Sequence, residues 1–219
     1  MSEMLWLDGQ DIFGFTVEKQ EIPRPGNAPY YLMPVQTGIG VLHTTETNDV
    51  QSALDAMDGS SRPADPCHFI AGENRIVQTR AVGTQAASLR PPANTSAYIQ
   101  IEMVGKTDDP PRPQNQLWLP LASTLRPAVA LIAWCSKNYG IPLIVPNNWT
   151  DGIDDVKPFP SSNNSRRLAA VAHGFWPHSR GWWMHLEIPF QAPSWHWDCG
   201  AVRRTIMLQQ AQALLNANP

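Results

Sequence analysis

Cysteine is scarce in this sequence, and so are the patterns in which cysteine builds structure. The 219 residues include three cysteines, none of them in a CxxC pair. An odd number without paired spacing argues against a disulfide framework and against a cysteine-rich structural zinc site. Cys67 and Cys135 stand among apolar residues. We therefore expect both to be small core residues.

Long apolar runs are also missing. The longest, residues 127–135, is far shorter than the about 20 residues that a bilayer requires. The first residues lack the basic start and the apolar stretch of a signal peptide. We expect no membrane insertion, and synthesis in the cytoplasm without a signal peptide.

The sequence contains few charged residues of either sign. The net charge is −3, and Lys and Arg form no long run, so nucleic acid is not expected as a partner. Hydrophobic residues make up 42% and charged residues 16%, as in an ordinary globular protein. The length suits one large core. We expect a monomer with a single domain over residues 1–219, in which residues 1–36 form an N-terminal extension packed on the remainder.

Strand and helix patterns alternate along the chain. Expected strands occupy residues 38–43, 68–71, 75–79 and 97–104, with short ones at 13–17 and 141–145, and expected helices occupy 50–57, 117–139 and 203–215. Residues 146–167 are polar and rich in Pro and Asn, which indicates an irregular surface excursion. The alternation predicts an α/β fold with a central mixed β-sheet flanked by helices.

Candidate metal ligands come from two distant parts of the chain. His43 ends an expected strand, whereas His185 and Asp198 lie in a stretch, residues 184–201, with neither helical nor strand periodicity. Catalytic zinc is held by three ligands drawn from His, Cys and carboxylate, and its fourth position stays open for water. His43, His185 and Asp198 therefore predict a zinc site. Cys199 is an alternative to Asp198, because a thiolate also binds zinc well.

Glu102 is unusual because it lies within an apolar strand. Alternation places it on the face opposite Ile101 and Met103. Burying a carboxylate is costly unless it has a partner or a task. Two interpretations follow: an edge strand whose Glu faces water, or a general base whose pKa is raised in a dry site.

The other histidines carry less specific signals. His68 lies on an expected strand, where a hydrogen-bonded core histidine is the simpler interpretation. His173 and His178 remain reserve candidates for a cleft. Five of the nine tryptophans lie near the expected ligands, where they can stack on sugar rings or fill the core: Trp176, Trp182, Trp183, Trp195 and Trp197.

Four segments, taken in order, resemble a known family. They are Gly-Val-Leu-His-Thr-Thr-Glu (40–46), His-Phe-Ile-Ala-Gly-Glu-Asn-Arg-Ile-Val-Gln (68–78), Ile-Gln-Ile-Glu-Met-Val-Gly (99–105) and His-Leu-Glu-Ile-Pro followed by His-Trp-Asp-Cys-Gly (185–200). Residues 38–201 thus resemble the type 2 N-acetylmuramoyl-L-alanine amidases, a family that includes phage lysozymes of the amidase type and peptidoglycan recognition proteins.

The resemblance implies roles for individual residues. His43, His185 and Asp198 match the zinc ligands, Glu102 the catalytic acid, and His196 the residue that steadies the oxyanion. Substrate contacts are assigned to Thr44, Trp195 and Trp197.

Two departures from the family pattern bear on the ligands. The usual Asp-Pro-Gly stands here as Asp-Cys-Gly, and this register favours Asp198 over Cys199. The loop between His185 and Asp198 is longer than usual, which leaves His178 as a substitute for the second ligand.

The resemblance also implies an activity. It is the Zn²⁺-dependent hydrolysis of the amide bond between N-acetylmuramic acid and L-alanine in peptidoglycan, by a phage endolysin or a bacterial wall-degrading enzyme that acts on the cell wall after release. Two alternatives are a non-catalytic peptidoglycan-binding module and a zinc peptidase acting on the stem peptide.

Overall fold

The computed structural model describes residues 4–22, 32–33, 38–58, 66–89, 93–106, 120–146, 174, 176–188 and 202–219. Within them, one seven-stranded sheet has the order β1-β2-β5-β4-β6-β3-β7. The strands are β1 (Asp11–Ile12), β2 (Phe15–Lys19), β3 (Ile39–Thr44), β4 (Phe69–Gly72), β5 (Arg75–Gln78), β6 (Ile99–Met103) and β7 (Gly181–Met184). The helices are α1 (Val50–Met57), α2 (Ala122–Tyr139) and α4 (Arg204–Ala217), with 3₁₀ turns η2 (Ala93–Thr95) and η5 (His185–Glu187).

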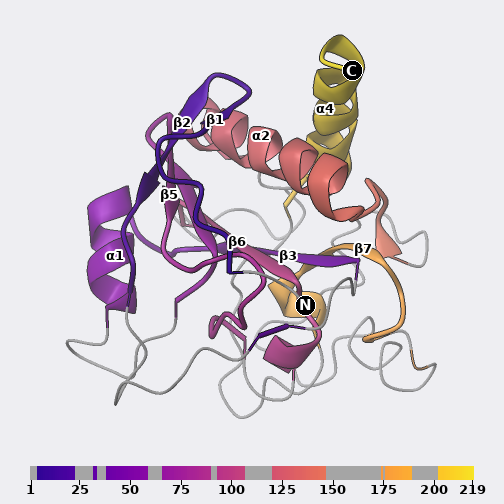
Figure 1. The fold of residues 1–219 in the computed structure, drawn as a ribbon, viewed down its shortest axis with the longest axis horizontal. Coiled ribbons are helices and arrows are strands. Elements are labelled where there is room, and N and C mark those ends of the chain that lie inside the picture. The colour runs from indigo at the N-terminus through magenta and orange to yellow at the C-terminus, as the bar shows by residue number, and fades with distance from the viewer. Residues whose placement is uncertain are drawn as a thin grey trace.

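The sheet is mixed. Strands β4, β6, β3 and β7 are parallel to one another, whereas β5 runs antiparallel to β4 and β1 antiparallel to β2. The carboxyl ends of β6, β3 and β7 therefore meet at one edge of the sheet. The predicted α/β single domain with a central mixed sheet is confirmed (Figure 1).

The two faces of the sheet are covered differently. Leu42 on β3 belongs to the large core cluster that includes residues of α2 and α4. Its neighbour Val41 points to the opposite face, into a cluster with Trp176 and Trp183. Helix α1 packs on Ile70 of β4, in a third cluster. In Figure 1, α1 lies at the side of the molecule away from α4.

Helix α2 begins later than the pattern for 117–139 suggested, at Ala122, and residues 117–119 lie outside the described part. It ends at Gly140, which takes the left-handed conformation expected of a helix cap, with φ +62°. Pro127 does not interrupt it. Because Pro127 has no N–H, the carbonyl of Ser123 is left to accept a hydrogen bond from the Asn74 N–H at 2.7 Å. The proline thus helps to join α2 to the turn between β4 and β5.

The N-terminal segment is part of the sheet. The short strand expected at 13–17 is present as β2, two residues further on, and it pairs with β5. Gln78 at the end of β5 accepts a hydrogen bond from the Leu7 N–H (2.7 Å) and donates one to the Leu5 carbonyl (2.9 Å). A buried amide side chain therefore ties Leu5 and Leu7 to the core.

The strand expected at 141–145 is absent, and the unpredicted strand β7 lies beside that segment instead. The Trp182 N–H of β7 donates to the Ile144 carbonyl at 3.1 Å. A side chain at Gly181 would come within 2.6 Å of that carbonyl. A run of only four residues, two of them tryptophan, does not show by its pattern whether it forms a strand.

The expectation that two of the cysteines are small core residues is confirmed. Cys67 and Cys135 are buried free thiols, and burial raises the pKa of both. No helix in the described part of the chain has the length and apolar character needed to cross a bilayer.

Candidate active site

Strands β3 and β7 bring two histidines together. Leu42 stands opposite Met184 in the parallel register, so the next residues, His43 and His185, are neighbours. Their Nδ1 atoms are 3.2 Å apart, although 142 positions separate them in the sequence. The ring centroids lie 4.7 Å apart. Both side chains are buried.

Glu102 approaches His43 from the other side. The register pairs His43 directly with Glu102 of β6, and Glu102 Oε1 lies 3.8 Å from His43 Nδ1. Strand β6 is interior to the sheet, between β4 and β3, and Glu102 is only 6% exposed. The interpretation of Glu102 as a water-facing residue on an edge strand is therefore wrong.

The spacing of the two imidazoles fits a metal ion. At zinc–nitrogen distances of 2.0–2.1 Å, two ligands on a tetrahedral ion lie about 3.3–3.4 Å apart, close to the observed 3.2 Å. Neutral imidazole nitrogens are common metal ligands. Among the described residues, no group of three or more His, Cys, Asp and Glu side chains is placed to hold a metal ion.

Several predicted site residues lie outside the described residues. These are Asp198 and its alternative Cys199, the predicted oxyanion residue His196, Trp195 and Trp197, and the reserve candidate His173. The excursion at 146–167 lies outside as well, except for its first residue. Their assignments stay predictions.

His178 is described and is exposed in the turn that precedes β7. Its substitution for His185 was an open alternative. The imidazole that faces His43 is that of His185.

Thr44 is the last residue of β3 and is buried. Its hydroxyl donates a hydrogen bond to Glu46 Oε1 at 2.7 Å. Glu46 has φ +54°, in the left-handed region that is costly for a residue other than glycine. The Thr44–Glu46 contact therefore helps to hold the turn beside the two histidines.

Core packing accounts for three of the five tryptophans near the expected ligands. Trp182 and Trp183 are completely buried and belong to clusters on opposite faces of the sheet. Trp176 packs edge-on against Trp183, with ring centroids 5.2 Å apart. These three rings stabilise β7 and the turn before it.

Glu187 and Arg204 were not singled out by sequence. The guanidinium of Arg204 donates to both Glu187 oxygens, at 2.7 and 3.2 Å, and both side chains are completely buried. The sequence contains one indication that an arginine here is unusual. Arg203 and Arg204 stand at the start of a helix, where the helix dipole disfavours cations.

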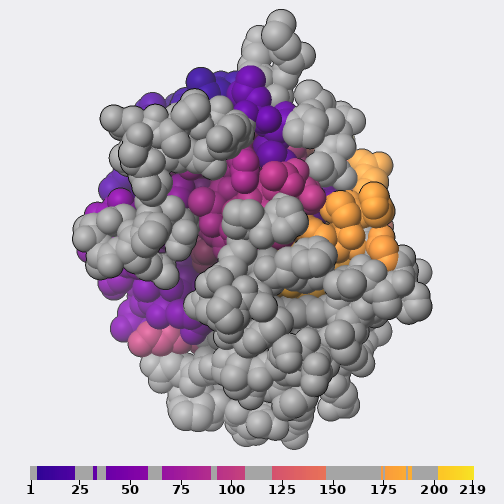
Figure 2. Space-filling model, turned by 90° about the horizontal axis from the view of Figure 1, so that it is seen from below, coloured from indigo at the N-terminus to yellow at the C-terminus, as the bar shows by residue number. Residues whose placement is uncertain are grey.

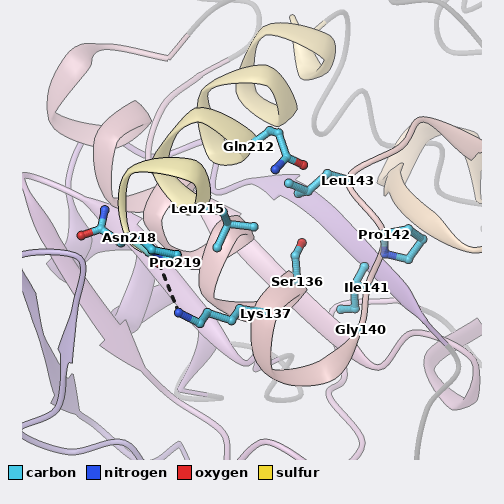
Figure 3. A pocket seen from close by; sticks show the side chains of 10 residues that line it. All are labelled: Ser136, Lys137, Gly140, Ile141, Pro142, Leu143, Gln212, Leu215, Asn218 and Pro219. Atoms are coloured by element: carbon cyan, nitrogen blue, oxygen red, sulfur yellow. Dashed lines mark hydrogen bonds between the residues drawn. The ribbon is translucent and has the colours of Figure 1, made fainter.

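A cavity of about 410 Å³ lies elsewhere, between the C-terminal ends of α2 and α4 (Figure 3). Its lining includes Ser136, Leu215 and Lys137, whose ammonium donates to the Asn218 carbonyl at 3.2 Å. None of the residues around His43 lines it. Figure 2 shows the segment that carries His185 (residues 176–188, orange) at the surface. Helix α4 (yellow), which lines the cavity, is not visible in that view.

No protein-family model matches the sequence, and no curated protein matches it. Solved structures do resemble its fold. The hydrolase AmiA of Staphylococcus aureus, solved in complex with its ligand, is similar over 92% of this chain and 85% of its own, with a TM-score of 0.52 and 11% identity.

Two further similar structures have lower TM-scores. The N-acetylmuramoyl-L-alanine amidase LysC from Clostridium intestinale is 13% identical, with a TM-score of 0.40, over 73% of this chain and 97% of its own. The Drosophila peptidoglycan recognition protein SD is 15% identical, with a TM-score of 0.43, over 57% of this chain and 76% of its own.

Other similar structures include an endolysin from Bacillus subtilis and a second peptidoglycan recognition protein. The likeness to AmiA extends over most of both chains and shows a shared fold. The fold implied by the four sequence motifs is therefore confirmed.

Proposed function

We propose that this protein is a zinc-dependent hydrolase that cleaves the amide bond between N-acetylmuramic acid and L-alanine in peptidoglycan. The observation that carries the proposal is the meeting of His43, His185 and Glu102 at the carboxyl ends of three adjacent parallel strands. Open α/β sheets bind their ligands at this edge. The four sequence motifs support the choice of substrate, and the fold shared with the hydrolase AmiA supports a hydrolytic reaction.

His43, His185 and Asp198 would hold the metal. The short distance between the two Nδ1 atoms supports the two histidines, and Asp198 rests on its sequence motif. A zinc ion bound here would act as a Lewis acid, lowering the pKa of water toward about 7 and polarising the carbonyl of the scissile amide.

Glu102 would transfer the proton. Its carboxylate lies beside the imidazole pair and is nearly buried, so it can accept a proton from the attacking water and return it to the leaving amine. His196 would donate a hydrogen bond to the carbonyl oxygen as negative charge develops there. Thr44, Trp195 and Trp197 would contact the glycan and peptide.

Digestion of purified cell walls tests the proposal. Mass spectrometry should find new free L-alanine amines. Glu102→Gln should lower their release by at least about a hundredfold while circular dichroism and the melting temperature stay close to wild type. Glu21→Gln, which changes an exposed carboxylate away from the site, should leave release unchanged.

Other outcomes point to the alternatives. New ends within the stem peptide would identify a peptidase, and wall binding without new ends would identify a binding module. Full activity of Glu102→Gln would remove the role assigned to this carboxylate.

The proposal includes where the protein acts. It would reach peptidoglycan after release from the cytoplasm, as a phage endolysin or a bacterial wall-degrading enzyme, and would work as a monomer. Adding the purified protein to permeabilised cells should clear the suspension, and unchanged turbidity would contradict this part.

A further inference from the structure

His185 stands on a single turn of 3₁₀ helix, η5, which follows directly from β7. The turn is closed by a hydrogen bond from the Ile188 N–H to the His185 carbonyl at 2.9 Å. The side chain of Glu187 folds back, and its Oε2 accepts a hydrogen bond from the Met184 N–H at 3.0 Å. Glu187 therefore braces the backbone on both sides of His185.

Arg204 holds Glu187 in this position. Each oxygen of the Glu187 carboxylate accepts a hydrogen bond from a different guanidinium nitrogen. The nitrogen Nη1 also donates to the Trp182 carbonyl of β7 at 2.8 Å. One guanidinium from the first residue of α4 thus joins the last strand of the sheet to the turn that carries His185.

Fold stability alone gives little reason for this pair. Both side chains are completely buried, and desolvating two charges commonly offsets their attraction. Arg204 also stands at the positive end of the dipole of α4. Apolar side chains of similar size often stabilise such a position as well or better. Apolar side chains cannot, however, form a bidentate, directional hydrogen-bonded contact.

We propose that Glu187 and Arg204 are positioning residues that hold the His185 imidazole at the correct distance from His43 for a shared metal ion. The proposal rests on the zinc site of the proposed function. His43 is fixed by its place inside the sheet, between β6 and β7. The position of His185 depends instead on a short turn, and the buried ion pair determines how that turn sits on β7.

The test measures zinc affinity directly, by competition of the full chain with a chromophoric chelator. In the double variant Glu187→Met with Arg204→Met, no charge is left uncompensated, so we expect it to fold. Its dissociation constant for zinc should rise about ten- to a hundredfold, the usual effect of removing a residue that orients a metal ligand. The visible absorption spectrum of the Co²⁺-substituted protein should change as well, because it reports the ligand geometry.

A second variant and a control make the result decisive. Arg204→Lys keeps the buried positive charge but cannot make the fork, so it should fold and show a smaller rise in the dissociation constant. If the double variant does not fold, the zinc affinity of Arg204→Lys tests the positioning role by itself. The control is Glu18→Gln with Arg75→Met, which removes an exposed fork between β2 and β5 and should leave affinity and spectrum unchanged.

Failure of this proposal differs from failure of the proposed function. If the wild type binds zinc and the folded variants bind it equally, with the same Co²⁺ spectrum, the positioning role is wrong and the zinc site stands. If the wild type binds no zinc, both are wrong. Glu102→Gln, which leaves Glu187 and Arg204 in place, should bind zinc and lack hydrolysis.

Discussion

His43 on β3 and His68, which directly precedes β4, are both completely buried, yet their surroundings differ. The backbone occupies both nitrogens of His68. Its Nδ1 accepts from the Gln100 N–H at 3.0 Å, and its Nε2 lies 2.8 Å from the Thr84 carbonyl. The Nδ1 of His43 instead faces a second imidazole. A histidine satisfied by backbone groups maintains the fold, whereas one that faces other titratable side chains is available for chemistry.

Two Arg–Glu pairs show a similar contrast, because one is exposed and the other is buried next to His185. Arg75 and Glu18 form a fork at 2.7 and 2.8 Å between β5 and β2, with both side chains nearly half exposed. Arg204 and Glu187 form theirs next to His185, completely buried. The same pair of residue types forms a surface contact between β2 and β5 and a buried contact next to His185.

The largest expected effect is that of His43→Asn. We expect zinc binding to be lost and wall hydrolysis to fall at least about a thousandfold, because the metal's contribution to transition-state stabilisation is worth several kcal/mol. Asn is smaller and polar, so urea unfolding should show a folded protein. Zinc content and the release of L-alanine amines are the measurements. Unchanged zinc content would contradict the predicted ligand.

His68→Leu should have the opposite profile. It leaves a buried N–H and a buried carbonyl without their partner, at about 1–3 kcal/mol each. We expect the free energy of unfolding in urea to fall by about 2–6 kcal/mol. Hydrolysis per folded molecule should stay at the wild-type value. A loss of activity as large as that of His43→Asn would contradict the claim that His68 only maintains the fold.

The pH dependence of stability should also identify His68. Burial lowers the pKa of His68 from 6.5 to about 4. The unfolded chain therefore binds a proton between these values and the folded protein does not, so this contribution is complete above pH 6.5 and is lost as the pH falls toward 4. The loss should reach about 3 kcal/mol. Urea unfolding at several pH values measures it, and the slope in this window should be smaller in His68→Leu.

The smallest effect is expected at the exposed fork. Arg75→Gln should lower the free energy of unfolding by less than about 1 kcal/mol, and 1 M salt should remove most of the difference. The hydrogen bond from Arg75 lowers the pKa of Glu18, so the remaining effect should disappear in acid. A cost of several kcal/mol would show that exposure does not separate the two pairs.

Much of the fold could be predicted from local pattern. The strands at β3, β4, β5 and β6 and the helices α1, α2 and α4 were expected close to their observed positions. Their apolar residues recur with the period of a strand or a helix over a window long enough to recognise. Strand β7 was missed because Gly-Trp-Trp-Met is too short to show a period.

Part of the candidate site was also accessible. His43 and Glu102 stand out because a polar residue in an apolar strand needs a reason. Glu187 and Arg204 did not stand out, since each is an ordinary charged residue until the first residue of α4 meets the end of β7 and the turn that follows it. The zinc ligands, the oxyanion residue and the substrate contacts remain predictions.

The sequence by itself determined most of the helices and the longer strands, and which side chains carry suitable chemistry, because these depend on composition and spacing within a few residues. Only the tertiary structure decided that His185 rather than His178 faces His43, that Glu102 is interior, and that Arg204 supports the turn. Contacts of this kind depend on strand order and register. Hydrogen bonds and packing between distant segments set both, and no local pattern records them.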